Sequence, residues 1–503
     1  MSLLLLILFL VAGGGAAWAG ERLAPQAPQW ISVAVLTLAL AFTLGLAAAV
    51  PESGGPALAL QDPASWLVYW KTDWMPRLGV SLEFGIDGIG LLLVLLTLAL
   101  GVVAVSASWN EISWRGGFFH ANLLFSVAGV VGVFTALDLL LFFVFWEVML
   151  VPMYLLIAIW GHESRAYAAM KFFIFTQASG MLLLLSVVLL AWQAADGGAL
   201  SFSYFDLLQA EIPAGLAWWL MLGFFVAFAV KLPTFPLHSW LPDAHTQAPT
   251  AGSVLLAGVL LKTGAYGLLR FCLPLFPQAS QAFAPLAMAL GVAGVLYAGV
   301  LALAQQDFKR LVAYSSISHM GFVILGLYAF NLLGTQGAVM QMVAHGISSA
   351  ALFTIAGALQ QRLHTRDMRR MGGLWTPMPR LGAAALFFAL AALGLPGLGN
   401  FIGEFLVFLG LFAVAPWTAA AAALGMVTAA VYALSLLQRS FHGAVTAQEA
   451  PADCSLREQL TLTLMMAALL WLGLFPQTVL SLAEPGTRAI VDLFGAAAGG
   501  HAP

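Results

Sequence analysis

The stretch Phe224-Phe-Val-Ala-Phe-Ala-Val-Lys-Leu-Pro-Thr-Phe-Pro-Leu-His-Ser-Trp-Leu-Pro-Asp-Ala-His245 runs from a strongly apolar segment into a lysine and then into three prolines. The apolar part has the composition of a helix inside a lipid bilayer. Proline lacks the backbone N–H and clashes with the preceding turn, so a regular helix cannot continue past Lys231. At membrane depth such a break is tolerated only where protein or a water-filled cavity surrounds the freed backbone groups. The stretch therefore predicts a membrane protein with a broken helix beside a buried charge.

The composition of the whole chain supports this interpretation. Of its 503 residues, 62% are hydrophobic and only 8% are charged, which excludes a water-soluble enzyme. The net charge of −3 shows none of the basic excess of a nucleic-acid-binding protein. The two cysteines are too few for an iron-sulfur cluster or a zinc finger, and the chain has no phosphate-binding or dinucleotide-binding glycine motif.

Apolar windows between charged or Pro/Gly-rich breaks predict an all-α integral membrane protein with about fourteen transmembrane helices. The windows lie near residues 2–20, 29–50, 84–108, 117–135, 139–160, 168–193, 215–240, 250–269, 282–304, 310–330, 336–361, 381–415, 417–438 and 459–480. The first window lacks the basic residues that precede the apolar core of a signal peptide, so we expect it to remain as the first span. The tryptophan-rich segment 51–83 is expected to be an interfacial loop.

The basic residues divide unevenly between the two sets of alternating loops. One set holds 13 of the 19 lysines and arginines: Arg22, Arg115, Arg165, Lys171, Lys309, Arg310, Arg362, Arg366, Arg369, Arg370, Arg380, Arg439 and Arg457. The other set holds Lys71, Arg77, Arg270 and Arg488. The positive-inside rule then predicts a protein of the inner (cytoplasmic) membrane with both termini on the non-cytoplasmic side. This topology separates Cys272 from Cys454, so the two thiols are not expected to pair.

Four charged residues fall inside predicted spans, where an ionised group is costly: Glu147, Lys231, Lys262 and Glu404. Burial moves the pKa values of carboxylates and amines toward neutrality, so such groups suit proton transfer. Glu147 and Lys231 are expected to form an ion pair whose separation changes during turnover, and Lys262 is expected on an uninterrupted helix. The alternative is a set of structural ion pairs.

Four histidines fall in or beside spans and could relay protons: His238, His245, His319 and His345. A packing role is the more ordinary interpretation of a lone histidine. Haem ligation is disfavoured, because Pro242 separates the two closest histidines.

A second Gly/Pro break, at residues 393–403, precedes Glu404 and resembles the first in severity. The prolines at 233 and 396 are 163 residues apart, and spans 4–8 match spans 9–13 in number and length. Paired breaks of this kind indicate inverted repeats. We therefore expect a single membrane domain, 1–503, with three N-terminal helices in 1–116, a first five-helix repeat in 117–274, a second inverted repeat in 282–440, and a C-terminal loop and helix in 441–503.

Four segments carry a resemblance to a known family. They are FWEVMLVPMY at 145–154, KLPTFPLHSWLPDAHTQAP at 231–249, DFKRLVAYSSISHMG at 307–321 and GLPGLGNFIGE at 394–404. Together they resemble the antiporter-like membrane subunits of respiratory complex I, the NADH-quinone oxidoreductase, over essentially the whole chain. The resemblance implies fourteen helices, two inverted five-helix repeats and broken helices seven and twelve.

The resemblance also assigns roles in proton transfer. Glu147 matches the family's glutamate of helix five, Lys231 its partner lysine of helix seven, and Lys262 the central lysine of helix eight. Glu404 matches the exit-side group, which is glutamate in the M-type subunit and lysine in the L-type and N-type. The histidines His319 and His345 match those of the polar axis, while His238 is a further possible relay. The residues after Leu480 are too few for the long lateral helix of the L-type, so the M-type is expected.

The resemblance implies a proton-translocating subunit without redox chemistry of its own. NADH, FMN, iron-sulfur clusters and quinone would belong to partner subunits, and this chain would bind no cofactor or metal. Its expected partners are the L-type and N-type subunits on either side, together with membrane lipids. The alternative function is a subunit of an Mrp-type cation/proton antiporter or of a membrane-bound hydrogenase, which use the same fold. A purely structural scaffold would not need Lys262.

Overall fold

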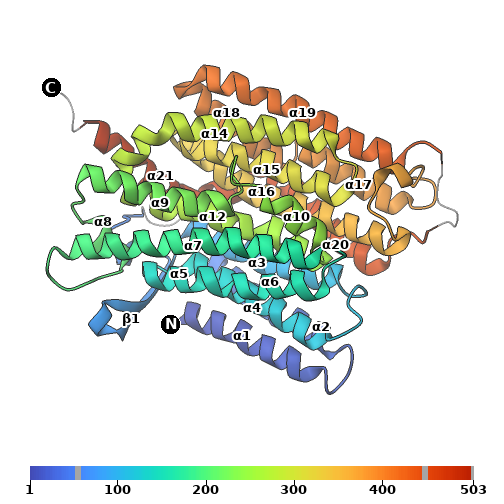
Figure 1. Cartoon of the computed structure of the whole chain (residues 1–503), viewed down its shortest axis with the longest axis horizontal. Helices are drawn as coiled ribbons and strands as arrows, with labels where there is room; N and C mark the ends of the chain where they lie inside the picture. The colour runs from blue at the N-terminus through green and yellow to red at the C-terminus, as the bar shows by residue number, and fades with distance from the viewer. Residues whose placement is uncertain (51–57, 445–450, 500–503) are drawn as a thin grey trace.

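The computed structural model describes residues 1–50, 58–444 and 451–499 and shows a bundle of long helices that run side by side (Figure 1). The first spans are α1 (Ser2–Gly20), α2 (Ala27–Ala48), α3 (Gly88–Ala107), α4 (Gly116–Thr135), the continuous pair α5 (Leu139–Val148) and α6 (Leu150–Trp160), and α7 (Arg165–Ala195). Short polar side chains begin several helices by accepting a backbone N–H, as at Asp87, Asp138, Asp307, Asn331 and Ser455. Sequence windows and helices therefore agree closely in this part of the chain.

The seventh span is broken, as predicted. It comprises α9 (Ala214–Lys231), an irregular segment at 232–239, and α10 (Trp240–Gln247). The break is shorter than the run of three prolines, because the helix resumes at Trp240 although Pro242 follows. Pro242 lies in the first turn of α10. A backbone N–H at this position has no intrahelical acceptor, so the proline costs the helix no hydrogen bond.

The eighth span is not the uninterrupted helix that was expected, and it extends to residue 275. It comprises α11 (Thr250–Leu255), the π-helical segment η3 (Leu256–Leu260), α12 (Leu261–Gly267), a second π-helical segment η4 (Leu268–Cys272), and α13 (Leu273–Leu275). Arg270, which was predicted in a loop, lies inside this span, is 1% exposed and pairs with Asp87. Every residue in the most apolar window of this span is buried within the protein.

The second repeat follows after a single residue, Phe276. Its helices are α14 (Pro277–Ala304), α15 (Phe308–Leu327), α16 (Leu332–Leu363), the pair α17 (Pro379–Ala392) and α18 (Gly399–Val414), and α19 (Pro416–Phe441). The break between α17 and α18 contains Gly394 and Gly397, whose φ angles of +80° and +94° favour glycine. A unit of five passes begins and ends on opposite sides of a membrane, so two such units in succession are inverted. Breaks at spans seven and twelve confirm the predicted architecture.

Within the described residues, twelve helical spans are long and apolar enough to cross a membrane. A further bent pair qualifies as one span, α20 (Leu456–Leu474) with α21 (Gln477–Gly499), whose axes meet at 66°. The shorter α17 and α18 together fill the predicted twelfth window. The sequence analysis placed no helix after Leu480, so α21 is a correction.

A further difference concerns one end of the bundle. The predicted interfacial loop folds instead, in its described part, into an antiparallel hairpin of β1 (Val68–Met75) and β2 (Val80–Ile86); residues 51–57 lie outside the described chain. The hairpin, α8 (Tyr204–Leu208) and α21 lie at the same end, on the left in Figure 1, which we call the hairpin end. The opposite end, which we call the basic end, carries loops with most of the arginines. The remaining short elements are the 3₁₀ turns η1 (Pro63–Ser65), η2 (Pro76–Leu78) and η5 (Met368–Arg370).

Candidate functional site

Lys262 lies at the centre of the bundle on α12 and is completely buried. Its Nζ is 2.8 Å from His345 Nδ1 on α16 and also donates to the carbonyl of Ala257. Two glycines allow this contact: a Cβ on Gly346 would lie 2.8 Å from the carbonyl oxygen of Gly258, so only glycine permits the two backbones to approach this closely. The close approach of η3 to α16 thus places the lysine against the histidine.

Glu404 lies in the second turn of α18, directly after the break, and is 2% exposed. Its Oε1 is 2.8 Å from His319 Nδ1 on α15 and accepts a hydrogen bond of 3.1 Å from Gln341 Nε2 on α16. The other ring nitrogen of His319 lies 3.1 Å from the hydroxyl of Tyr432 on α19. Glu404 is therefore held by side chains from two other helices and linked through His319 to a third.

The contact of Lys262 with His345 and the contact of His319 with Glu404 lie end to end and form one row of side chains. The rings of His319 and His345 are 5.4 Å apart between centroids, which leaves a single step between the Lys262 contact and the Glu404 contact. All four side chains are at most 3% exposed and come from four different spans. A neutral imidazole accepts a proton on one nitrogen and releases one from the other, so the row alternates groups that can hold and pass a proton. We call these four residues the buried row.

Glu147 and Lys231 do not form the predicted ion pair in this structure. Neither Lys231 Nζ nor Glu147 Oε1 has a hydrogen-bond partner among the described residues. The ammonium lies instead 4.9 Å from the centre of the Trp146 ring, a cation–π distance. The carboxylate faces α7, where a Cβ on Gly180 would come within 2.1 Å of it. The two charges are near enough to interact electrostatically but not to share a hydrogen bond.

His238 does not join the buried row. Its ring stacks on Phe235 at 5.7 Å and meets the edge of Tyr297 at 5.5 Å, in the broken segment of span seven. Its Nδ1 has no hydrogen-bond partner in the part of the chain that the structure describes. Its role as a relay stays a prediction.

Gln341 and Tyr432 also lie in the candidate site, and sequence reasoning missed them. Gln341 precedes His345 by four residues, one helical turn, so a polar stripe at that spacing was the available signal. Tyr432 stands alone in an apolar helix and gave no signal. Its position depends on how α19 packs, which the sequence does not show.

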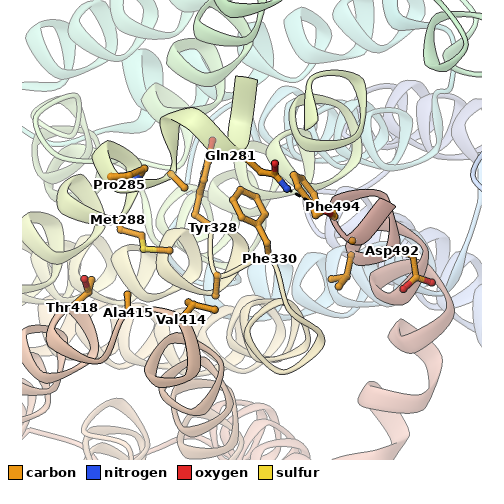
Figure 2. A pocket seen from close by; sticks show the side chains of 14 residues that line it. Gln281, Pro285, Met288, Tyr328, Phe330, Val414, Ala415, Thr418, Asp492 and Phe494 are labelled. Atoms are coloured by element: carbon orange, nitrogen blue, oxygen red, sulfur yellow. Dashed lines mark hydrogen bonds between the residues drawn. The ribbon is translucent and has the colours of Figure 1, made fainter. Parts of the chain in front are cut away.

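Other features of the structure lie apart from the row. A cavity of about 830 Å³ opens between the ends of α14, α15, α19 and α21, with Gln281, Met288, Tyr328, Phe330 and Phe494 in its wall, and none of the four row residues lines it (Figure 2). Among the described residues, no three His, Cys, Asp or Glu side chains gather where they could hold a metal ion. The cysteines at 272 and 454 are both buried and unpaired, as predicted.

Known proteins that resemble this chain in sequence and those that resemble it in structure belong to the same class. Residues 136–431 match the family described as NADH:quinone oxidoreductase/Mrp antiporter, TM. The chain is 51% identical to NADH-quinone oxidoreductase subunit M of Pseudomonas aeruginosa over 98% of both chains. It superposes with a TM-score of 0.88 on a chain of respiratory complex I from Thermus thermophilus, at 31% identity, covering 98% of this chain and 100% of that one. A chain of the Mrp complex from Dietzia sp. DQ12-45-1b gives a TM-score of 0.82 at 20% identity, covering 98% and 97%, which shows a shared fold alone.

Two broken spans in inverted repeats around a buried charged row thus define a protein of the antiporter-like class of membrane subunits. Within that class, the chain belongs to the family of NADH-quinone oxidoreductase subunit M. The prediction of the M-type from Glu404 is confirmed. The chain is a multi-pass membrane subunit of a respiratory complex.

Proposed function

We propose that this chain translocates protons across the membrane while partner subunits transfer electrons from NADH to quinone. The observation that carries the proposal is the buried row, in which a lysine of the first repeat and a glutamate of the second repeat are joined by two histidines. A scaffold has no use for four buried titratable side chains, because each costs desolvation energy. In this proposal Lys262 is the central proton-holding group, His345 and His319 relay the proton, and Glu404 releases it.

Glu147 and Lys231 form a second charged site at the break in span seven. We propose that they act on the buried row through their charge. When the two groups move apart or together, the electrostatic potential at Lys262 changes. The side chains Trp146 and Phe172 flank the Lys231 ammonium and keep it away from bulk water.

The distribution of basic residues supports an orientation in which the basic end faces the cytoplasm and both termini face the other side of the cytoplasmic membrane. The L-type and N-type subunits are the proposed neighbours, since the family resemblance implies a row of such subunits. NADH, FMN, iron-sulfur clusters and quinone are proposed to reside in partner subunits. The two separate cysteines of this chain are too few to ligate an iron-sulfur cluster, which supports placing the clusters in partner subunits.

The alternative of an Mrp-type antiporter or hydrogenase subunit has less support. The likeness to the Mrp chain concerns the fold, whereas half of all residues are identical to subunit M. We therefore retain redox-driven proton translocation as the proposed function.

The test is Lys262→Ala in the assembled complex, with proton uptake and NADH:quinone reduction measured on the same proteoliposomes. Loss of the relay group should slow proton transfer through this subunit by about tenfold or more, so the proton-to-electron ratio falls. Arg488→Ala is the matched control, because this cation is exposed and pairs with Glu484 one turn away. An assembled Lys262→Ala complex with an unchanged ratio would contradict the proposal.

A further inference from the structure

Tyr432 contacts the buried row without belonging to it. Its side chain is 1% exposed on α19, and its hydroxyl lies 3.1 Å from Nε2 of His319. The other ring nitrogen of His319, Nδ1, is 2.8 Å from Oε1 of Glu404. Both nitrogens of His319 are therefore engaged, and neither is open to a proton that arrives from His345.

The chemistry of the partners fixes where the hydrogen atoms of the two rings lie. A protonated Lys262 has only N–H donors, so His345 accepts at Nδ1 and carries its own hydrogen on Nε2. An ionised Glu404 has only acceptors, so His319 donates from Nδ1. Its Nε2 then carries no hydrogen, and the hydroxyl of Tyr432 donates to this nitrogen.

This arrangement interrupts the row between the two histidines. The N–H at Nε2 of His345 is buried and has no acceptor among the described residues. The ring of His319 is only 5.4 Å away between centroids, but its bare nitrogen is held by Tyr432. Gln341 lies one turn before His345 on α16, and its Oε1 is also buried without a partner in the described chain. This oxygen can hold a water molecule that takes the proton onward from His345.

We propose that Tyr432 is a positioning residue that closes the row between His345 and His319 by holding Nε2 of His319. The proton passes when the hydroxyl turns away from this nitrogen. The Nε2–H bond of His345 then breaks and an N–H bond forms on Nε2 of His319, directly or through one water. The proton on Nδ1 of His319 moves to the carboxylate of Glu404, and Lys262 protonates Nδ1 of His345.

One proton thus leaves the lysine and one reaches the glutamate, without any change of oxidation state. The inference rests on the proposed function, because it assigns the point at which the same row opens and closes.

Two other roles of Tyr432 compete with this one, and the three make different demands on the hydroxyl. A packing role for α19 needs only the ring, which phenylalanine keeps. A relay role needs the hydroxyl to carry the proton itself, so its removal blocks transfer. A closing role needs the hydroxyl only to occupy the nitrogen, so its removal leaves the row open.

The experiment compares Tyr432→Phe with wild type in the assembled complex in proteoliposomes. Passive proton leak is measured under an imposed pH gradient without NADH, and the proton-to-electron ratio and quinone reduction are measured during turnover. The leak should rise by about two- to tenfold, the factor that corresponds to the loss of one hydrogen bond. The ratio should fall while quinone reduction continues.

Tyr328→Phe is the matched control. It removes another fully buried hydroxyl, one without a hydrogen-bond partner in the described chain, from the wall of the cavity that the row residues do not line (Figure 2). This variant should match wild type in all three measurements.

A fluorinated tyrosine at position 432 tests the same point with the opposite sign. The ring keeps its shape, and the more acidic phenol is the stronger hydrogen-bond donor, so it should hold Nε2 of His319 more firmly. We expect slower proton transfer and no added leak. Transfer at the wild-type rate or faster would overturn the closing role, since packing predicts the former and a relay the latter.

Three results with Tyr432→Phe would also overturn it: a wild-type leak and ratio, loss of transfer without a leak, or failure to assemble beside an assembled Tyr328→Phe. A leak that persists when Lys262→Ala is added would show that it bypasses the row, with the same consequence. Lys262→Ala alone separates the two proposals. If it loses transfer while Tyr432→Phe behaves as wild type, the closing role is wrong and the proposed function stands. If Lys262→Ala pumps normally, the proposed function itself fails.

Discussion

Glu404 combines a buried carboxylate with a backbone break, and this combination distinguishes it from a simple ion-pair partner. Its Oε2 faces Gly394, where an added Cβ would lie at 3.1 Å, while Oε1 is shared between His319 and Gln341. One oxygen is thus held by the row and the other points at the break between α17 and α18. A proton on this group can leave in a direction different from the one in which it arrived.

We expect Glu404→Gln to assemble and to lose about tenfold or more of the proton transfer through this subunit, because the amide keeps the size but holds no transferable proton. Glu404→Lys keeps a titratable group beside His319 and should retain part of the activity. A static pair between Glu404 and a protonated histidine predicts the reverse for lysine, because two cations would face each other. Proton-to-electron ratios decide between these accounts, with Glu211→Gln in an exposed loop as the matched control.

For the charged site of span seven, we expect Glu147→Gln to impair pumping and Glu147→Asp to preserve part of it. The Lys231 ammonium lies against the face of the Trp146 ring. The negative charge of Glu147 still stabilises this ammonium electrostatically, although the two groups share no hydrogen bond. Removing that charge leaves a buried cation uncompensated. Wild-type pumping by an assembled Glu147→Gln complex would rule out a functional role for the pair.

The sequence alone located the buried charged residues, but it could not show which side chains they contact. Each of the four charged residues stood out because it interrupts an apolar run, and the structure buries three of them completely or nearly so. Contacts such as Lys262 with His345 depend on how helices 83 residues apart in sequence pack together. The separation of Glu147 from Lys231 in this structure was not predictable for the same reason, since nothing in the sequence showed that Trp146 would face the ammonium.

At the scale of elements, glycines set how closely the central helices approach. A Cβ on Gly264 would lie 2.6 Å from the carbonyl oxygen of Phe228 and 2.8 Å from the backbone nitrogen of Leu232, at the end of α9. Both atoms belong to the backbone, so no side chain can move aside. The position of Gly264 therefore fixes the spacing between the helix that carries Lys262 and the break beside Lys231.

We expect Gly264→Ala to destabilise the subunit by about 1–3 kcal/mol, the range for overpacking a filled core, and to reduce assembly or thermal stability of the complex. Gly45→Ala is the control, because nothing lies within 4 Å of its added Cβ and alanine favours helix. Thermal unfolding of the purified complexes measures the difference. Equal stability of the two variants would contradict the packing argument.

Helix positions were largely predictable, because apolar windows of bilayer length leave few alternatives. The errors occurred where local geometry departs from the α-helix or where amphipathic segments replace apolar ones. The two π-helical segments carry no distinctive composition, and in a span that is buried on every side an extra residue in a turn disturbs no apolar stripe. The helix α21 contains Glu484, Arg488 and Asp492 on a partly exposed face, so a search for apolar windows overlooked it. The division of the chain into four regions stays a prediction.

At the scale of the whole molecule, the topology can be tested with single cysteines, because both native thiols are buried. Lys71 in the hairpin and Arg369 at the basic end have side chains that are 37% and 67% exposed. In intact cells a membrane-impermeant maleimide should label Lys71→Cys, and it should label Arg369→Cys only after the cytoplasmic side is opened. Labelling of both from one side would contradict the odd number of passes between them, and the opposite pattern would reverse the proposed orientation.

The junction between the repeats limits how the molecule can move. Phe276 is the single residue between α13 and α14; it is 2% exposed and packs against Phe224 at 5.4 Å. Transporters that rock one half against the other need a tether with enough slack to absorb the rotation. A buried one-residue tether offers none. The subunit is therefore better suited to work as a rigid block with a proton wire inside it, in which side chains and water rearrange while the two halves stay fixed.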